Sequence, residues 1–273
     1  MLTVFTVRET GNGFRSRIKE HFNPSAAQVC KISVPGGVPF VALSAVKRRG
    51  EIDWEDASAA IGGKSTYTLF ADGISPVADT PFRRFVPQQL PKIMLFNTAK
   101  EIIRRCCEPL SCSVCVVDGD GVLAPYAHTL CPLTREVRVL TGSGYYERCA
   151  RKALEEYGAA LVIAGRDCAQ IKGTCIISVC NNGSREQSNT LLLNGENARF
   201  VIKGADFTVP DEYASLCPDG INPKLFAEAL YECCAAPGLA NLIFSDVSVN
   251  GKVLALDSAT LYINKILDNV GNI

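Results

Sequence analysis

The feature that most constrains the fold is a regular alternation of apolar runs and helical spacing between residues 113 and 180. Short apolar runs bounded by glycine and polar residues are typical of strands buried in a parallel sheet, and parallel strands need crossover segments such as helices. The pattern therefore predicts an α/β fold with a mostly parallel sheet covered by helices. The four runs are SVCVVD, EVRVLTG, ALVIAG and TCIISVC.

Patterns beyond these runs predict the other elements of the C-terminal half. Residues 146–157 have helical spacing, with Ser143 as a plausible cap. TLLLN and RFVIKG are typical of two more strands, and Asn222 is placed to cap a later helix. The pair Asn250-Gly251 lies between alternating apolar residues, which predicts a C-terminal hairpin that closes the sheet.

The first hundred residues predict a small mixed α+β domain. MLTVFTV, CKISV and VPFVALSAV are typical of strands. Asp53 is placed to cap a helix that begins at Trp54. Thr98 and Glu101 fit a capping box for a second helix, which ends before Pro109.

The charge distribution predicts a domain boundary near Pro109. Residues 1–109 carry 15 Lys+Arg and 10 Asp+Glu, whereas residues 110–273 carry 13 and 18. This difference supports a small mixed domain over 1–109 and a larger α/β domain over 110–273.

Composition limits the classes of function. The whole chain has 28 basic and 28 acidic residues, so we expect no general affinity for nucleic acid. Thirteen cysteines are dispersed through apolar runs, which favours reduced, buried thiols over a disulfide framework. The sequence has no long apolar stretch and no signal-peptide pattern, so we expect a cytoplasmic protein without a membrane partner. The oligomeric state stays open.

The turn Asp118-Gly119-Asp120-Gly121 is the strongest candidate for a functional site. It follows an apolar run and precedes a short helix-like segment, which is where α/β sheets bind ligands. Aspartate and glycine are also the residues that a tight turn selects for its own geometry. We therefore expect a small ligand or a partner at this turn, without requiring catalysis, and we keep two enzymatic alternatives open.

The segment from residue 113 to residue 180 resembles the nucleotide-binding half of Rossmann-like NAD(P)-binding domains, including the shikimate dehydrogenase type. The resemblance implies a fold in which Gly119, Asp120 and Gly121 lie beside a pyrophosphate and Thr141 with Gly142 lie near the ribose. It implies an NAD(P)-linked oxidoreductase as one alternative. The chain departs from the family pattern because Asp120 adds negative charge between the two glycines and Thr141 replaces the acidic ribose-binding residue.

The same turn also resembles the first motif of haloacid dehalogenase-like phosphatases, which follows an apolar strand. That resemblance implies Asp118 as the nucleophile, Asp120 as the acid and base, and Thr141 as a phosphoryl ligand. Lys203 is the candidate for the family lysine, and Asp118, Asp120 and Asp206 are the candidates for binding magnesium. A magnesium-dependent phosphatase is therefore the other alternative.

Other reactive side chains have structural interpretations. Cys112 and Cys115 have metal-ligand spacing, but residues three apart in a strand point to opposite faces, so we expect both thiols to be buried in the core. For the two histidines, His21 and His128, a solvated or hydrogen-bonded position is expected more often than a role as a general base.

Overall fold

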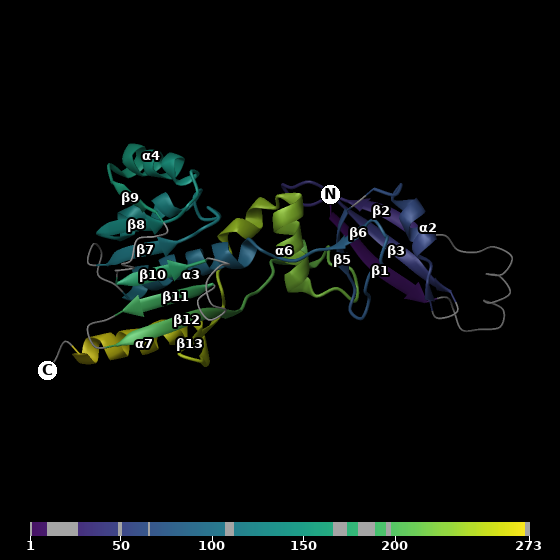
Figure 1. Ribbon diagram of the computed structural model, residues 1–273. Coiled ribbons are helices and arrows are strands. Elements are labelled where there is room, and N and C mark those ends of the chain that lie inside the picture. Colours follow the sequence, from purple (N-terminus) through teal and green to yellow (C-terminus); the bar gives the residue numbers. More distant parts are fainter. Residues whose placement is uncertain are drawn as a thin grey trace. The chain divides into compact units, whose positions relative to one another are not determined.

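The chain forms two compact units, each of which combines segments that are distant in the sequence (Figure 1). Unit 1 consists of residues 1–90 and 209–240, and unit 2 consists of residues 91–208 and 241–273. Each unit is built on its own β-sheet with helices, which confirms the predicted α/β class. The computed structural model describes residues 2–9, 27–48, 51–64, 66–106, 112–165, 174–179, 189–194 and 198–270.

Unit 1 contains a mixed sheet in the order β2-β3-β1-β5-β6, and β4 pairs with β3. The central strand β1 runs parallel to both of its neighbours, β3 and β5, so the carboxyl ends of these three strands lie at one edge. The strands β2 and β3, which overlap the predicted strands CKISV and VPFVALSAV, form an antiparallel pair. The strands are β1 (Leu2–Glu9), β2 (Gln28–Ile32), β3 (Phe40–Arg48), β4 (Glu51–Ile52), β5 (Thr66–Phe70) and β6 (Phe82–Arg84).

The helices of unit 1 come from both parts of the chain. Helix α2 (Trp54–Ala60) starts at the predicted cap, since the Asp53 carboxylate accepts a hydrogen bond from the Asp56 amide. The later segment adds α5 (Asp211–Ala214), α6 (Pro223–Cys234) and most of the 3-10 helix η2 (Pro237–Asn241). Helix α6 contacts β1 and β5, and Phe226 packs edge-on against Phe40 at 5.4 Å between ring centroids.

The parallel part of the unit 2 sheet has the strand order β9-β8-β7-β10. All three pairs in this part are parallel, and β7 is the central strand that the first apolar run predicted. The chain moves outwards from β7 to β8 and β9, and then returns to the other side of β7 as β10. The direction of succession therefore reverses at β7. The elements are β7 (Ser113–Val117), the 3-10 helix η1 (Ala127–Leu133), β8 (Glu136–Leu140), α4 (Tyr146–Tyr157), β9 (Leu161–Ala164) and β10 (Cys175–Ser178).

The rest of this sheet is antiparallel, in the order β10-β11-β12-β13-β14. The sheet is therefore mixed, with three parallel and four antiparallel pairs, and the prediction of a mostly parallel sheet holds only for its first part. The four residues between β11 and β12 and the two between β13 and β14 leave no room for a crossover helix, so the strands of these two pairs must be antiparallel. The strands are β11 (Thr190–Asn194), β12 (Arg199–Asp206), β13 (Asp246–Val249) and β14 (Lys252–Ala255).

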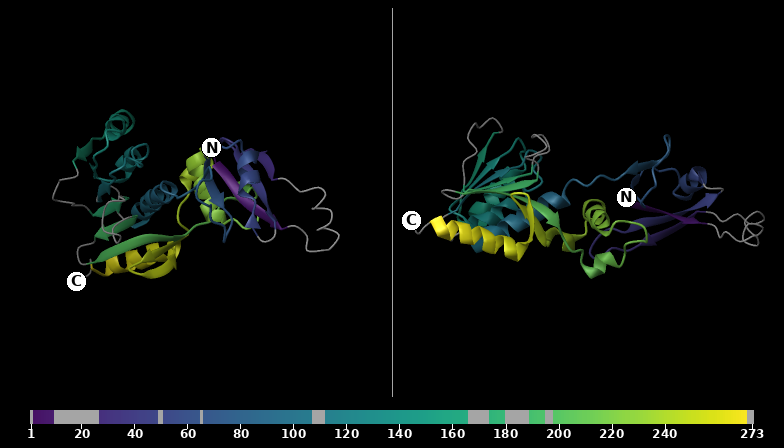
Figure 2. Two further views of the ribbon diagram at one scale, coloured as in Figure 1. Left: turned by 45° about the vertical axis from the view of Figure 1, so that its right-hand side comes forward. Right: turned by 90° about the horizontal axis from the view of Figure 1, so that it is seen from below.

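The C-terminal hairpin is confirmed and is followed by a further helix. Asn250 and Gly251 both have positive φ, as a tight two-residue turn between β13 and β14 requires. Helix α7 (Leu256–Val270), which the alternating pattern did not predict, contacts β13 and β14 (Figure 2).

Two helix starts differ from the predictions. Helix α3 (Leu90–Cys106) is continuous through Thr98, whose hydroxyl accepts a hydrogen bond from the Phe244 amide instead of capping a helix. Helix α4 begins at Tyr146 without a side-chain cap, and the Ser143 hydroxyl accepts only a long 3.4 Å bond from the Tyr145 amide. The Thr98 hydroxyl is used by a residue 146 positions away, which local sequence does not specify.

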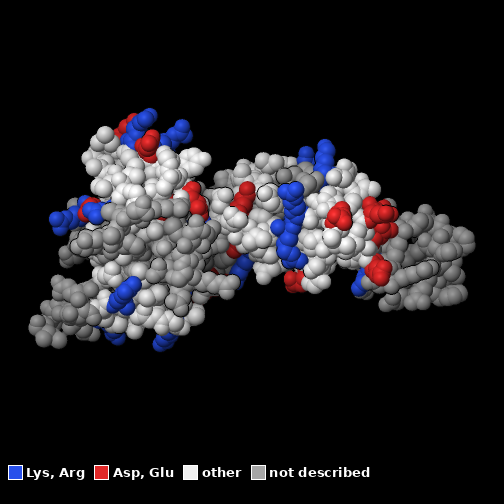
Figure 3. Space-filling model, in the orientation of Figure 1, with Lys and Arg blue, Asp and Glu red and all other residues white. Residues whose placement is uncertain are grey.

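The division into units also differs from the single boundary predicted near Pro109, a residue outside the described part of the chain. A step in net charge along the sequence cannot reveal that a later segment, residues 209–240, packs with the first ninety residues. On the face drawn in Figure 3, basic and acidic side chains are interspersed over the described surface of each unit. Within the described residues, no helix has the length and apolar character needed to span a membrane.

Candidate functional site

The turn predicted from the sequence lies at the carboxyl end of β7, where the order of strands reverses. Parallel neighbours flank β7 on both sides, and the turn is anchored to one of them because the Asp118 amide donates to the Leu140 carbonyl at 3.1 Å. In open α/β sheets, a reversal of this kind leaves a crevice at the carboxyl edge in which ligands bind. The structure therefore places Asp118, Gly119, Asp120 and Gly121 where a ligand site is expected.

The Asp118 carboxylate is fully buried and accepts four hydrogen bonds from its surroundings. Its Oδ1 accepts from the amides of Asp120 and Gly121 at 3.3 and 3.0 Å. Its Oδ2 accepts from the Leu123 amide at 2.7 Å and from the Tyr146 hydroxyl at 2.8 Å. The amides that would face a bound phosphate in such a turn are thus already bonded to a carboxylate of the chain itself.

This arrangement does not fit the two groups that the resemblances imply. A pyrophosphate at the turn would have to displace Asp118 from these amides, because both anions need the same donors. Magnesium at Asp118 would have to compete with N–H and O–H donors that hold both carboxylate oxygens. An in-line attack by Asp118 on phosphorus would require an oxygen that is open to substrate, whereas both oxygens are enclosed.

Gly121 brings the turn close to the loop between β8 and α4. Its φ is +78°, and a Cβ at this position would lie 2.4 Å from the Ser143 hydroxyl and 3.0 Å from the Tyr145 ring. A side chain here would therefore strain the backbone and collide with the second loop. In that loop Thr141 is buried and its hydroxyl accepts from the Ser143 amide at 3.0 Å, while Gly142 is exposed.

Asp120 faces Lys92, a residue that was not among the predicted site residues. Lys92 is the third residue of α3, and its Nζ lies 3.3 Å from Asp120 Oδ2. The Lys92 side chain is 3% exposed, whereas the Asp120 side chain is 45% exposed. A lysine is seldom this deeply buried, and here the amine is paired with a carboxylate that is partly exposed to solvent.

The sequence contains a signal for Lys92 and none for Tyr146. Lys92 is spaced with Phe96, Ala99 and Ile103 at intervals of four, seven and eleven residues, so it lies on the apolar stripe of α3, and all three neighbours are buried. A lysine on such a stripe indicates a buried amine. Tyr146 has the same spacing as ordinary core residues of α4, and only the structure brings its hydroxyl to Asp118.

The remaining phosphatase candidates are not brought to the turn. Lys203 lies on β12, three strands away from β7, which corresponds to about 14 Å at the usual spacing between strands. Its side chain is exposed. Asp206 ends the same strand, and its carboxylate accepts from the Phe207 amide at 2.6 Å. The roles implied for these residues stay predictions without a supporting geometry.

His128 and the cysteines have structural environments. His128 is buried on η1, with Nε2 3.4 Å from a Glu156 carboxylate oxygen, and burial lowers the pKa of its imidazole. Glu156 lies near the C-terminal end of α4, about 15 Å along the helix from Tyr146, which contacts the turn. His128, which contacts Glu156, is therefore remote from the turn. Cys112 and Cys115 are buried as expected, and His21 lies outside the described residues.

Neither a metal site nor a relative emerges from these observations. Among the residues that the structure describes, no three or more His, Cys, Asp or Glu side chains are grouped so that they could hold a metal ion. Comparisons with protein-family models, with curated proteins and with solved structures found no match to this chain. The geometry of the site is therefore the basis for a functional assignment.

Proposed function

We propose that this protein binds a small anionic ligand at the carboxyl end of β7, through the Lys92 amine, in a Rossmann-like unit 2. The observation that carries the proposal is the buried Lys92 amine paired with the half-exposed Asp120 carboxylate. Asp120 then acts as an internal counterion that a ligand carboxylate or phosphate replaces. Catalysis is not part of this proposal.

The order of strands supports the Rossmann-like assignment. The parallel strands succeed one another outwards from β7 to β9 and then resume at β10 on the other side, as in the first four strands of a doubly wound sheet. Such sheets bind ligands in the crevice beside the first strand. Lys92 and Asp120 lie at that position.

The energetics of Lys92 support a functional role. Burying an ammonium group costs free energy, and a methionine of similar length can often replace a buried ion-paired residue with no loss of stability. Packing alone therefore does not explain a lysine at this position. An amine that stays buried until an anion reaches it would explain both its burial and its exposed partner.

The charge of the site indicates an anion bound by the amine instead of by the turn. Asp118 already bonds the amides of Asp120, Gly121 and Leu123, so they offer little to a ligand. Rotation of the Asp120 side chain towards solvent would leave the Lys92 amine as the available cationic donor. A charge-assisted bond between an ammonium group and a carboxylate or phosphate is among the stronger hydrogen bonds in proteins.

Two substitutions with opposite effects test the proposal. The shift in unfolding temperature is measured with inorganic phosphate and with short-chain carboxylates, because a ligand that binds only the folded state raises this temperature. Asp120→Asn removes the internal competitor and is expected to tighten binding by about tenfold. Lys92→Met is expected to abolish binding. Lys100→Met, which removes another lysine of α3, is the matched control and should bind like the unaltered protein.

Binding that survives Lys92→Met, or that weakens in Asp120→Asn, would contradict the proposal. The two enzymatic alternatives are tested in parallel. Stabilisation by NAD, NADH, NADP or NADPH at millimolar concentration would favour the oxidoreductase, and magnesium-dependent hydrolysis of p-nitrophenyl phosphate that is lost in Asp118→Asn would favour the phosphatase. We expect neither result, because Asp118 occupies the amides and has no open oxygen.

A further inference from the structure

Unit 1 contains a pocket of about 790 Å³ at the carboxyl edge of its own parallel strands. The end of β1 contributes Thr6 and Val7, the end of β3 contributes Lys47, and the segment after β5 contributes residues 71–75 and 77. β1 lies between the parallel strands β3 and β5, so this edge has the same topological character as the carboxyl end of β7 in unit 2. The volume is within the range of small-molecule sites in proteins.

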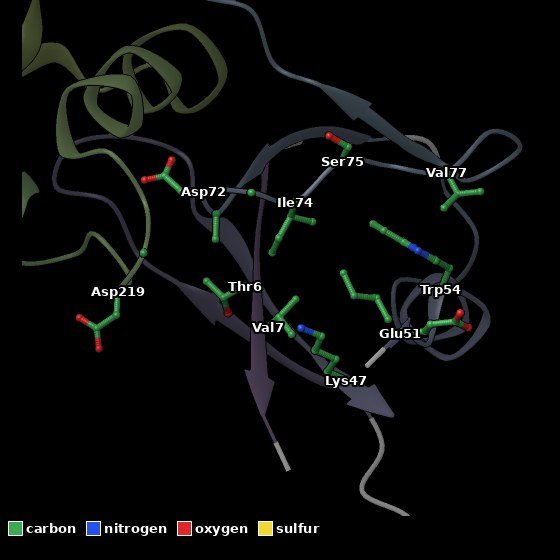
Figure 4. Close-up of a pocket in the computed structure, with 14 residues that line it drawn as sticks. Thr6, Val7, Lys47, Glu51, Trp54, Asp72, Ile74, Ser75, Val77 and Asp219 are labelled. Carbon is green, nitrogen blue, oxygen red and sulfur yellow. The ribbon is translucent and has the colours of Figure 1, made fainter. Parts of the chain in front are cut away.

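One wall of the pocket is apolar and fixed by the core of unit 1. Val7, Ile52, Trp54 and Ile74 are half-buried and pack against the core cluster that contains Phe5. The Trp54 ring stacks on the Phe5 ring at 5.2 Å between centroids and 25° between planes, which holds the indole in place. Figure 4 shows the indole extending from α2 towards Ile74. This wall is suited to the apolar or aromatic body of a ligand.

Lys47 is the basic residue among those that line the pocket, and Glu51, Asp72 and Asp219 are the acidic ones. Figure 4 shows Lys47 extending from the end of β3 towards Val7, inside the ring of lining residues. The carboxylates of Asp72 and Asp219 lie at the end away from Trp54 and point away from the apolar side chains (Figure 4). Glu51 and both aspartates are exposed, so solvent and salt screen the effect of their carboxylates on a ligand inside the pocket.

We infer that unit 1 binds an amphipathic organic anion, with its apolar or aromatic body against Trp54 and Ile74 and its carboxylate on the Lys47 amine. The site is separate from the one proposed in unit 2, since the two share no residue. The inference goes beyond the function proposed above and does not depend on it. A ligand of this class needs both an apolar wall and one cationic donor, which is what the pocket combines.

Trp54 is the single tryptophan of the chain, so tryptophan fluorescence reports directly on this pocket. The 273-residue chain is titrated with phenylbutyrate, phenylbutanol and phenylbutylamine, which share one apolar body and differ in charge. Phenylbutyrate is expected to change the emission saturably and to bind about tenfold more tightly than the alcohol, with the amine weakest. Calorimetric titration of the same compounds provides a second readout.

Substitutions identify the residue responsible. Lys47→Met is expected to raise the Kd of phenylbutyrate about tenfold, whereas Lys47→Arg keeps the positive charge and should stay within about threefold. Lys31→Met removes an exposed lysine of β2 outside the pocket and should have no effect. Asp72→Asn should leave binding unchanged or tighten it slightly. Tighter binding of the amine, equal binding of all three compounds, or no saturation in either readout up to about 10 mM would overturn the inference.

Discussion

At the scale of single residues, Asp118 behaves as a built-in anion. Its side chain supplies from within the chain what a phosphate would supply in a nucleotide-binding turn, and it bonds three backbone amides and one hydroxyl. The turn is therefore ordered by hydrogen bonds to a side chain of its own. Its stability should depend on the carboxylate much more than on any one of its four donors.

Asp118→Asn is expected to reduce the free energy of unfolding by about 3 kcal/mol, because the amide NH₂ of asparagine would face N–H or O–H donors in a buried site. Tyr146→Phe removes one donor and is expected to cost about 1 kcal/mol. Denaturant unfolding followed by circular dichroism measures both. Glu155→Gln, an exposed change on α4, is the control. Equal costs for Asp118→Asn and Tyr146→Phe would show that the turn does not depend on the carboxylate.

Glu228 in α6 provides a prediction on pH. Burial, with a smaller contribution from Glu232, raises the pKa of the Glu228 carboxyl from 4.5 to about 7. The folded state therefore holds this proton at pH values where the unfolded chain has lost it. Stability that is present below about pH 4.5 is lost progressively as the pH rises to about 7.

Glu228→Gln should remove this loss. The variant is expected to be more stable than the unaltered protein by about 1–2 kcal/mol at about pH 8, after allowance for solvent screening, and to differ little at about pH 4. Unfolding of unit 1 followed by Trp54 fluorescence measures the difference. Glu212→Gln, an exposed change in α5, should show no such dependence. A constant difference between Glu228→Gln and the unaltered protein at both pH values would contradict the assignment.

At the scale of elements, the site depends on two loops that approach each other across β7 and β8. Gly121→Ala should destabilise the protein by about 2–3 kcal/mol, because the positive φ disfavours any side chain and the new Cβ would meet Ser143. The double variant Gly121→Ala with Ser143→Gly removes the nearest contact but keeps the backbone strain. Denaturant unfolding should therefore show partial recovery. Full recovery of the free energy of unfolding would mean that the positive φ of residue 121 contributes nothing to the loss of stability.

The elements that the sequence predicted well are those whose signals are local. Asp53, Asn222 and the pair Asn250-Gly251 act through amides or dihedral angles within a few residues, and all are found as expected. Thr98 is different, because its hydroxyl bonds an amide 146 residues away. Its spacing to Glu101 fitted a helix start, but only the tertiary structure determines which donor reaches it.

The candidate site divides in the same way. The position of the Asp118 turn after β7 followed from an apolar run and a glycine pair, so its location could be predicted. The partners of the two aspartates could not be predicted. Tyr146 reaches Asp118 only through the packing of α4, and Lys92 reaches Asp120 from a helix that precedes β7. The sequence thus located the turn, while the partners that determine its chemistry come from other elements.

At the scale of the whole molecule, unit 1 is completed by residues 209–240. The Val38 amide donates to the Cys234 carbonyl at 2.7 Å, and Gly37 lies so close to this carbonyl that a Cβ would approach it to 2.5 Å. The ring of Phe226 covers Phe40. Residues 1–109, the domain that charge alone indicated, lack all of these contacts.

A fragment of residues 1–109 is therefore expected to show no cooperative unfolding, with tryptophan emission typical of solvent exposure. Addition of a peptide covering residues 209–240 should restore cooperative unfolding and shift the emission of Trp54, because the peptide supplies α6 and its contacts with β1 and β5. A peptide of the same composition in scrambled order is the control. A fragment that unfolds cooperatively alone would show that α6 is dispensable.

The discontinuity of unit 1 has a consequence for biosynthesis. When the first ninety residues leave the ribosome, the helix that covers β1 and β5 has not yet been translated, and at about 5–20 residues per second it follows roughly 7–30 s later. During that interval the nascent strands present an uncovered apolar face. Chaperone engagement on the ribosome should accordingly concentrate on the first strands and end once residue 240 has emerged.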